Sequence, residues 1–98
     1  MGYDVYIDGE CADRFNSASA WEEAAIFIEK NTPANTALRR LAELGETHRP
    51  QQAAAALSDL LEQQQPVADV ARTLRHVHSL LKLADHVLIT DGVIDEEP

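Results

Sequence analysis

The sequence contains one cysteine, Cys11, so it has neither an internal disulfide framework nor a cysteine-based zinc pattern. No apolar run approaches the roughly 20 residues that span a bilayer. The opening residues, MGYDVYIDGE, lack the basic stretch and apolar run of a secretory signal. These absences are typical of a reducing compartment, and we expect a cytoplasmic protein with no membrane contact.

Glycine is scarce, and the four glycines stand apart at positions 2, 9, 45 and 92. Their separation excludes a glycine-rich loop of the kind that cradles phosphates. Cys11 has no nucleophile signature around it, so we expect no enzyme activity and no cofactor. Aromatic residues form only 5% of the chain. Because much of the apolar content is alanine, closely packed helices are favoured over a sheet sandwich.

Basic residues are also few, with 8 Lys and Arg against 17 Asp and Glu, and the net charge is −9. The acids concentrate at the two ends, in residues 1–30 and 87–98, whereas residues 31–86 are balanced. A chain with this charge repels phosphate backbones and attracts basic protein surfaces. The composition therefore favours a protein partner over nucleic acid.

Residues 3–15, YDVYIDGECADRF, are predicted to form a β-hairpin. Apolar and polar residues alternate over Tyr3–Ile7, which is the period of a strand. Asp8-Gly9 supplies residues that tolerate a positive φ in a tight turn. A three-residue loop would place Tyr3 opposite Phe15 and bury Cys11, whereas a two-residue loop would send Cys11 to the other face. The sequence leaves this register open.

Four helices are expected in one domain that covers residues 1–98, over residues 19–31, 33–44, 51–64 and 66–88. Ser19 and Glu22 form the pattern of a capping box at the start of the first helix. Pro33 and Pro50 suit the first helical position of the next two helices, because proline lacks only an amide that would be unpaired there. Gly45 offers a helix stop between them.

The last helix carries the most regular apolar stripe in the sequence. Its apolar residues recur every seven positions in two interleaved series, Val67, Leu74, Leu81 and Leu88, and Val70, Val77 and Ala84. The stripe packs on the other helices of the same chain, on a second copy, or on both together. For self-association in a homodimer, the predicted contacts are Val70, Val77, Leu81 and Leu88.

The predicted fold is therefore mainly α, in the α+β class, with an N-terminal β-hairpin packed on a bundle of four helices and a long C-terminal helix. Residues 91–98 form either an acidic tail or part of a short hairpin. Because Val87-Leu88-Ile89-Thr90 is rich in β-branched residues, the sequence leaves open whether residues 87–95 are strand or helix.

The function expected from these features is binding of a basic surface on a partner protein. Ile26 lies among charged residues on the first helix, where it is either covered or a contact point. The predicted contact residues are Asp4, Asp13, Glu22, Glu23, Ile26 and Glu29. In charge and size alone the chain resembles small acidic inhibitors, immunity proteins and decoys of nucleic-acid-binding machinery.

Two alternatives remain. In the first, residues 51–64 and 66–86 form a helix-turn-helix that binds DNA, with residues 86–96 as a wing. Arg72, Arg75 and Lys82 would then contact phosphates, although the wing would carry several acids toward them. In the second, the chain is a purely structural dimerisation module.

Metal binding is not expected from the spacing of the histidines. His76, His78 and His86 are predicted to lie on the last helix, and His48 in a loop. On a continuous helix His78 and His86 would lie about two turns apart, too far to hold one ion without a further element.

Overall fold

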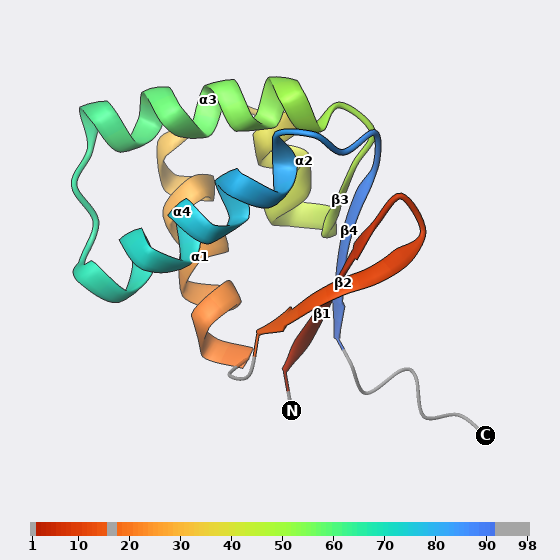
Figure 1. Ribbon diagram of the computed structural model, residues 1–98. Helices are drawn as coiled ribbons and strands as arrows, with labels where there is room; N and C mark the ends of the chain where they lie inside the picture. Colours follow the sequence, from red (N-terminus) through yellow and green to blue (C-terminus); the bar gives the residue numbers. More distant parts are fainter. Residues whose placement is uncertain (1, 16–17, 92–98) are drawn as a thin grey trace.

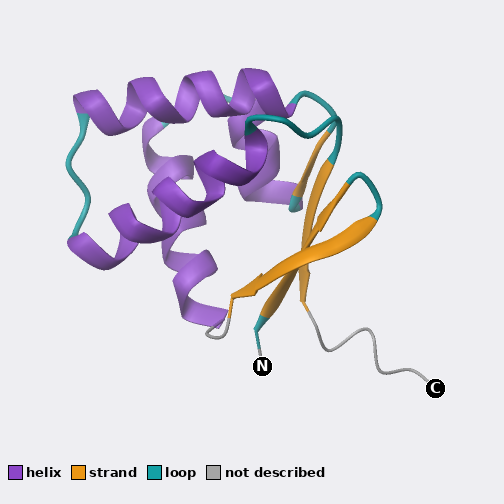
Figure 2. Cartoon of the chain, viewed as in Figure 1, coloured by secondary structure: helices purple, strands orange, loops and turns teal. Residues whose placement is uncertain are grey.

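The computed structural model of the chain describes residues 2–15 and 18–91 (Figure 1). Within these residues, four helices gather on one side of a four-stranded antiparallel sheet (Figure 2), which confirms the α+β class. The elements in chain order are β1 (Tyr3–Ile7), β2 (Glu10–Phe15), α1 (Ala18–Asn31), α2 (Ala37–Leu44), β3 (Glu46–Thr47), α3 (Pro50–Gln63), α4 (Ala68–Leu81) and β4 (Val87–Asp91).

The N-terminal hairpin turns through two residues. Asp8 and Gly9 have φ values of 54° and 89°, as a two-residue turn between twisted strands requires. Ile7 consequently faces Glu10, and exposed Cys11 faces Tyr6. A bulge then shifts the register, so that Tyr3 still lies opposite Phe15. Near the turn, the alternative with a two-residue loop and an exposed Cys11 is therefore correct. At the open end, the pairing of Tyr3 with Phe15 follows the other alternative.

The starts of α1 and α2 differ from the predicted ones. α1 begins at Ala18, so Ser19 lies within its first turn. The prediction that Pro33 opens the second helix is wrong, because α2 begins at Ala37 with Thr36 as its N-cap. The Thr36 hydroxyl accepts a hydrogen bond from the Arg39 amide at 3.3 Å. The Thr32 hydroxyl instead donates to the Ile28 carbonyl at 2.7 Å, which ties it to the end of α1.

Gly45 ends α2, as the sequence predicts. Its backbone is left-handed, with a φ of 76°, and its amide donates to the Leu41 carbonyl at 2.9 Å. The chain enters β3 directly after this glycine. α3 then begins with Pro50 in its first turn, also as expected.

The continuous helix predicted over residues 66–88 is wrong. α4 ends at Leu81, Leu83 is 93% exposed, and the chain turns into β4 at Val87. β-Branched residues gain more from ladder bonds and sheet packing than from a further helical turn. Leu88 accordingly belongs to a strand and lies opposite Tyr6. Of the open segment, residues 87–91 are strand, and residues 92–98 lie outside the described part of the chain.

β4 occupies an inner position in the sheet, whose strand order is β2-β1-β4-β3. It pairs antiparallel with β1 on one side and with the two residues of β3 on the other. The sheet therefore joins the N-terminal hairpin to the strand that follows α4. It also brings the end of α2 next to the residues that precede β4.

The apolar stripe of α4 is buried within a single chain. Val70, Leu74, Val77 and Leu81 all belong to the core, where α4 packs against α1 and α3. Ala84 is also buried, although it lies beyond the helix end. Packing on other helices of the same chain therefore accounts for the burial of these side chains.

Candidate functional site

Four of the predicted contact residues lie on the outward side of α1. Glu22 and Glu23 are exposed, Glu29 is half-buried, and Ile26 is 50% exposed. The Tyr3 hydroxyl donates a hydrogen bond to Glu22 Oε2 at 3.1 Å. Three- and four-residue spacing brings all three acids within one turn of Ile26. The opposite side of α1 is buried and packs against α2 and α4. We call Glu22, Glu23, Ile26 and Glu29 the α1 flank.

The other two predicted contact residues, Asp4 and Asp13, are engaged within the chain. Asp4 is only 6% exposed, and its Oδ1 accepts a hydrogen bond from Arg14 Nε at 2.7 Å. The Oδ1 of Asp13 accepts from the Arg14 amide at 2.7 Å, and its Oδ2 contacts His76 Nε2. The backbone bond from Arg14, followed by the bond from His76, lowers the pKa of Asp13 below its usual range. These carboxylates hold β2 to β1 and to α4.

The cationic residues proposed for the DNA-binding alternative are all exposed. Arg72 and Arg75 lie on α4, and Lys82 follows its last residue. Arg72 Nη1 donates to Asp69 Oδ1 at 3.1 Å, within the same helix. An exposed pair of this kind contributes little to stability, so the Arg72 side chain is available to another anion.

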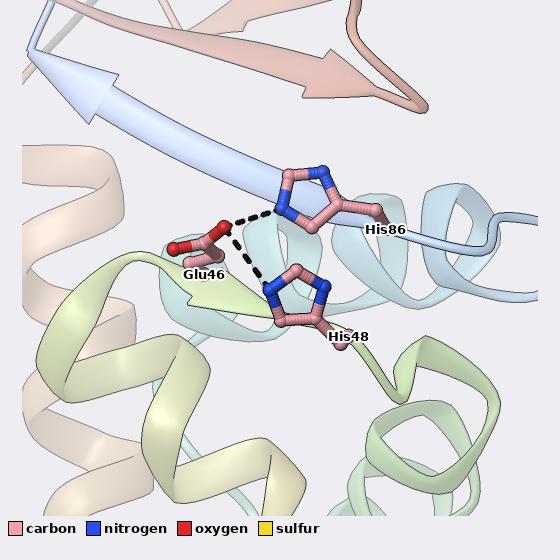
Figure 3. A group of neighbouring side chains, drawn as sticks. All are labelled: Glu46, His48 and His86. Carbon is pink, nitrogen blue, oxygen red and sulfur yellow. Dashed lines mark hydrogen bonds and ion pairs between the residues drawn. The ribbon is translucent and has the colours of Figure 1, made fainter.

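Glu46, His48 and His86 lie together, although the sequence predicted no such group. Figure 3 shows both imidazole rings turned toward the Glu46 carboxylate. The β3–β4 register explains this arrangement, because Glu46 faces Leu88 and Thr47 faces Val87. Continuation of that register by one residue places His48 opposite His86. Glu46 and His48 are two residues apart, so they share one face of the ladder.

The ligand atoms of this group are close. His86 Nε2 lies 2.5 Å from Glu46 Oε2, and His48 Nε2 lies 3.4 Å from the same oxygen. The two imidazole rings stack with their centroids 4.5 Å apart. The hydrogen bond from His86 is the main cause that lowers the pKa of Glu46. We call Glu46, His48 and His86 the histidine–glutamate cluster.

The backbone around this cluster is held by several hydrogen bonds. Asp8 Oδ1 accepts from the amides of Asp85 and His86 at 2.8 and 2.9 Å, and the Asp8 amide donates to the His86 carbonyl at 2.9 Å. On the other side of the cluster, the Ile89 amide donates to the Gly45 carbonyl at 2.6 Å. The hairpin turn and the end of α2 therefore both fix the strands that carry the cluster.

The cluster borders a hollow of about 740 Å³ between α2, β3 and α3. Glu46 and His48 contribute to its lining, together with Arg40, Arg49 and Gln52. The residues that line the hollow thus include charged and amide side chains.

Sequence reasoning missed the histidine–glutamate cluster because it assigned His86 to a helix. A local signal was nevertheless present. Glu46-Thr47-His48 follows a helix-ending glycine, and His86 precedes a β-branched run, so each group marks a strand boundary. Pairing of these two boundaries is a nonlocal event that neither segment encodes alone.

Comparison of the chain with protein-family models, with curated proteins and with solved structures finds no match. Among the helices of the described residues, none has both the length and the apolar character needed to cross a membrane.

Proposed function

We propose that the chain is a small cytoplasmic protein-binding module that uses the α1 flank to engage a basic, partly apolar surface on a partner protein. The observation that carries this proposal is the half-exposed Ile26 within one helical turn of Glu22, Glu23 and Glu29. An inhibitor, immunity or decoy protein would present a surface of this kind.

The two kinds of side chain have separate roles in such a contact. The carboxylates attract a positively charged partner and orient it during the encounter. Ile26 then supplies apolar area that loses water in the complex, as anchor residues of helix-in-groove contacts do. Asp4 is buried, and Asp13 is bonded to both Arg14 and His76, whereas Glu22 stays exposed although it accepts one hydrogen bond from Tyr3. The proposal therefore places the contact on α1 and not on the hairpin.

The test compares retention of partner proteins by immobilised wild-type chain and by a triple variant, Glu22→Gln, Ile26→Ser and Glu29→Gln. The matched control carries Asp59→Asn, Glu62→Gln and Leu83→Ser, which also removes two acids and one exposed apolar side chain. We expect the wild-type chain and the control to retain a basic protein, which high salt elutes. The α1 variant is expected to bind that protein at least about ten-fold more weakly. Equal retention by all three proteins would contradict the proposal.

A second candidate function is DNA binding through α3 and α4. The observation that favours it is the order α2-β3-α3-α4-β4 with β3 paired to β4, which attaches a two-helix unit to a sheet. Arg72, Arg75 and Lys82 are exposed along α4, as phosphate contacts require. The net charge of −9 opposes this function.

Titration with duplex DNA at low salt separates the two functions. If α4 binds DNA, the affinity falls steeply with salt. The double variant Arg75→Gln and Lys82→Gln is then expected to lower the slope of log affinity against log salt by about two, because two phosphate contacts are lost. Absence of binding at low salt would remove DNA binding and leave the protein-binding proposal untouched.

A further inference from the structure

Glu46, His48 and His86 bring one carboxylate and two imidazoles to the end of the β3–β4 ladder. We propose that this histidine–glutamate cluster is a binding site for one divalent transition-metal ion, with Zn²⁺ as the best fit. The proposal is independent of the α1 flank, which lies on another element.

The donor set selects the class of metal. Imidazole nitrogen suits zinc, copper and nickel, whereas calcium and magnesium require shells made of oxygen. Two histidines and one glutamate form a known three-ligand set for zinc, in which water or another molecule takes the fourth position. The cluster has this composition, and no cysteine is needed to complete it.

The distances are compatible with a tetrahedral ion. Zinc bonds of 2.0–2.1 Å place neighbouring tetrahedral ligands about 3.3 Å apart. The separation between Glu46 Oε2 and His48 Nε2 is 3.4 Å, and the three ligand atoms all lie within 4.8 Å of one another. His86 Nε2 is nearer to Glu46 Oε2, at 2.5 Å, because a hydrogen bond joins them. An ion that replaces the shared proton needs these two atoms to separate by about 0.8 Å.

The main chain that carries the ligands is already ordered. Glu46 lies in β3, and the two bonds that Asp8 Oδ1 accepts hold the main chain at His86. Sites on paired strands with a bonded backbone lose little conformational freedom when they bind an ion. The His48 side chain is 77% exposed, so an ion can enter from solvent and only one exposed ring must be ordered.

The ordinary alternative is a surface carboxylate that accepts hydrogen bonds from two histidines, with no affinity for metal. Both descriptions account for the stacked rings, but they differ in the response to Zn²⁺. An ion would bind the Nε2 lone pair of each ring, leave the ring proton on Nδ1, and link β3 to the start of β4.

The experiment is calorimetric titration of the tag-free full chain with ZnCl₂ at neutral pH. Glu46→Gln and His48→Asn each remove one ligand at a partly or largely exposed position. Glu62→Gln on α3 and His78→Asn on α4 are the matched controls, since each removes the same chemical group elsewhere. We expect one Zn²⁺ per chain for wild type and both controls, and affinity at least about ten-fold lower for each ligand variant.

A second measurement on the wild-type chain does not depend on the folding of any variant. In nitrogen-detected NMR spectra of the histidine rings, Zn²⁺ is expected to shift the His48 and His86 signals and to leave those of His76 and His78 unchanged. The proposal is overturned if wild type shows no saturable binding. It is also overturned if the ligand variants bind as tightly as the controls, or if the shifted rings are His76 and His78.

Discussion

Asp13 joins the N-terminal hairpin to α4 through a carboxylate with two partners. One oxygen accepts from the Arg14 amide and the other contacts His76. The His76 ring also meets the edge of Phe15, with ring centroids 6.2 Å apart, and Phe15 stacks on Trp21 at 6.0 Å. A polar contact therefore lies beside an aromatic one, and both fix β2 against the helices.

Replacement of Asp13 by Asn is expected to destabilise the protein at neutral pH and to have little effect in strong acid. The pKa of Asp13 is lowered in the folded chain, so its carboxylate stabilises the fold above the ordinary value of 3.8. That stabilisation is lost as the pH falls through the lower, folded value. Urea unfolding of Asp13→Asn and wild type at pH 7 and near pH 2 measures the difference.

The control for this prediction is Asp59→Asn on α3, which removes an exposed acid far along the chain from the hairpin. A double-mutant cycle with His76→Asn isolates the contribution of the contact between the two side chains. If the free energies of unfolding of Asp13→Asn and wild type differ by the same amount at every pH, the carboxylate charge has no part in stability.

At the scale of elements, local signals in the sequence predicted most of the helices and the hairpin. Gly45 stops α2 and Pro50 opens α3, because each effect depends on the backbone of one residue. The end of α4 could not be found in this way. The seven-residue pattern continues to Leu88, but the Val87–Asp91 backbone pairs with β1 and β3, which are distant in sequence. The histidine–glutamate cluster was missed for the same reason, since it exists only once β3 and β4 pair.

Gly45 is a residue at which two elements approach closely, and Gly45→Ala tests that contact. A Cβ at this position would overlap the Ile89 carbonyl oxygen, and the φ of 76° is unfavourable for alanine. Both backbones are bonded to each other through the Ile89 amide, so neither can move away freely. We expect the free energy of unfolding to fall by more than the roughly 1 kcal/mol associated with the backbone conformation alone.

Gly9→Ala is the matched control, because Gly9 also has a positive φ, of 89°, but an alanine Cβ there would have no heavy atom beyond its chain neighbours within 4 Å. The difference in stability between the two variants, from chemical denaturation, measures the close approach of α2 and β4. Equal losses in the two variants would mean that the contact between Gly45 and Ile89 relaxes without cost.

For the whole molecule, the sheet places the N-terminal hairpin beside the strand that ends at Asp91. β1 and β4 pair so that Tyr3 lies opposite Asp91, and the hairpin that contains β1 carries Asp8 and Glu10 at its turn. Negative charge that is separated in the sequence thus converges on one sheet. Such a field attracts basic partners and cations, which agrees with both proposals, and it weakens as salt is added.

The packing of the apolar stripe of α4 bears on whether the chain is a monomer or a dimer in solution. Because Leu74 is fully buried in the core, we expect Leu74→Ala to lower the free energy of unfolding by about 2–5 kcal/mol. If the stripe is satisfied within one chain, the unfolding midpoint of wild type and variant does not change with protein concentration, and sedimentation gives the mass of a monomer. Ala55→Gly, at an exposed position of α3, is the control and is expected to cost about 1 kcal/mol through helix propensity.

A different result would place the stripe between two chains. In that case the unfolding midpoint of wild type rises with protein concentration, and Leu74→Ala loses this dependence. The reason is that only an interface couples the stability of one copy to the abundance of the other.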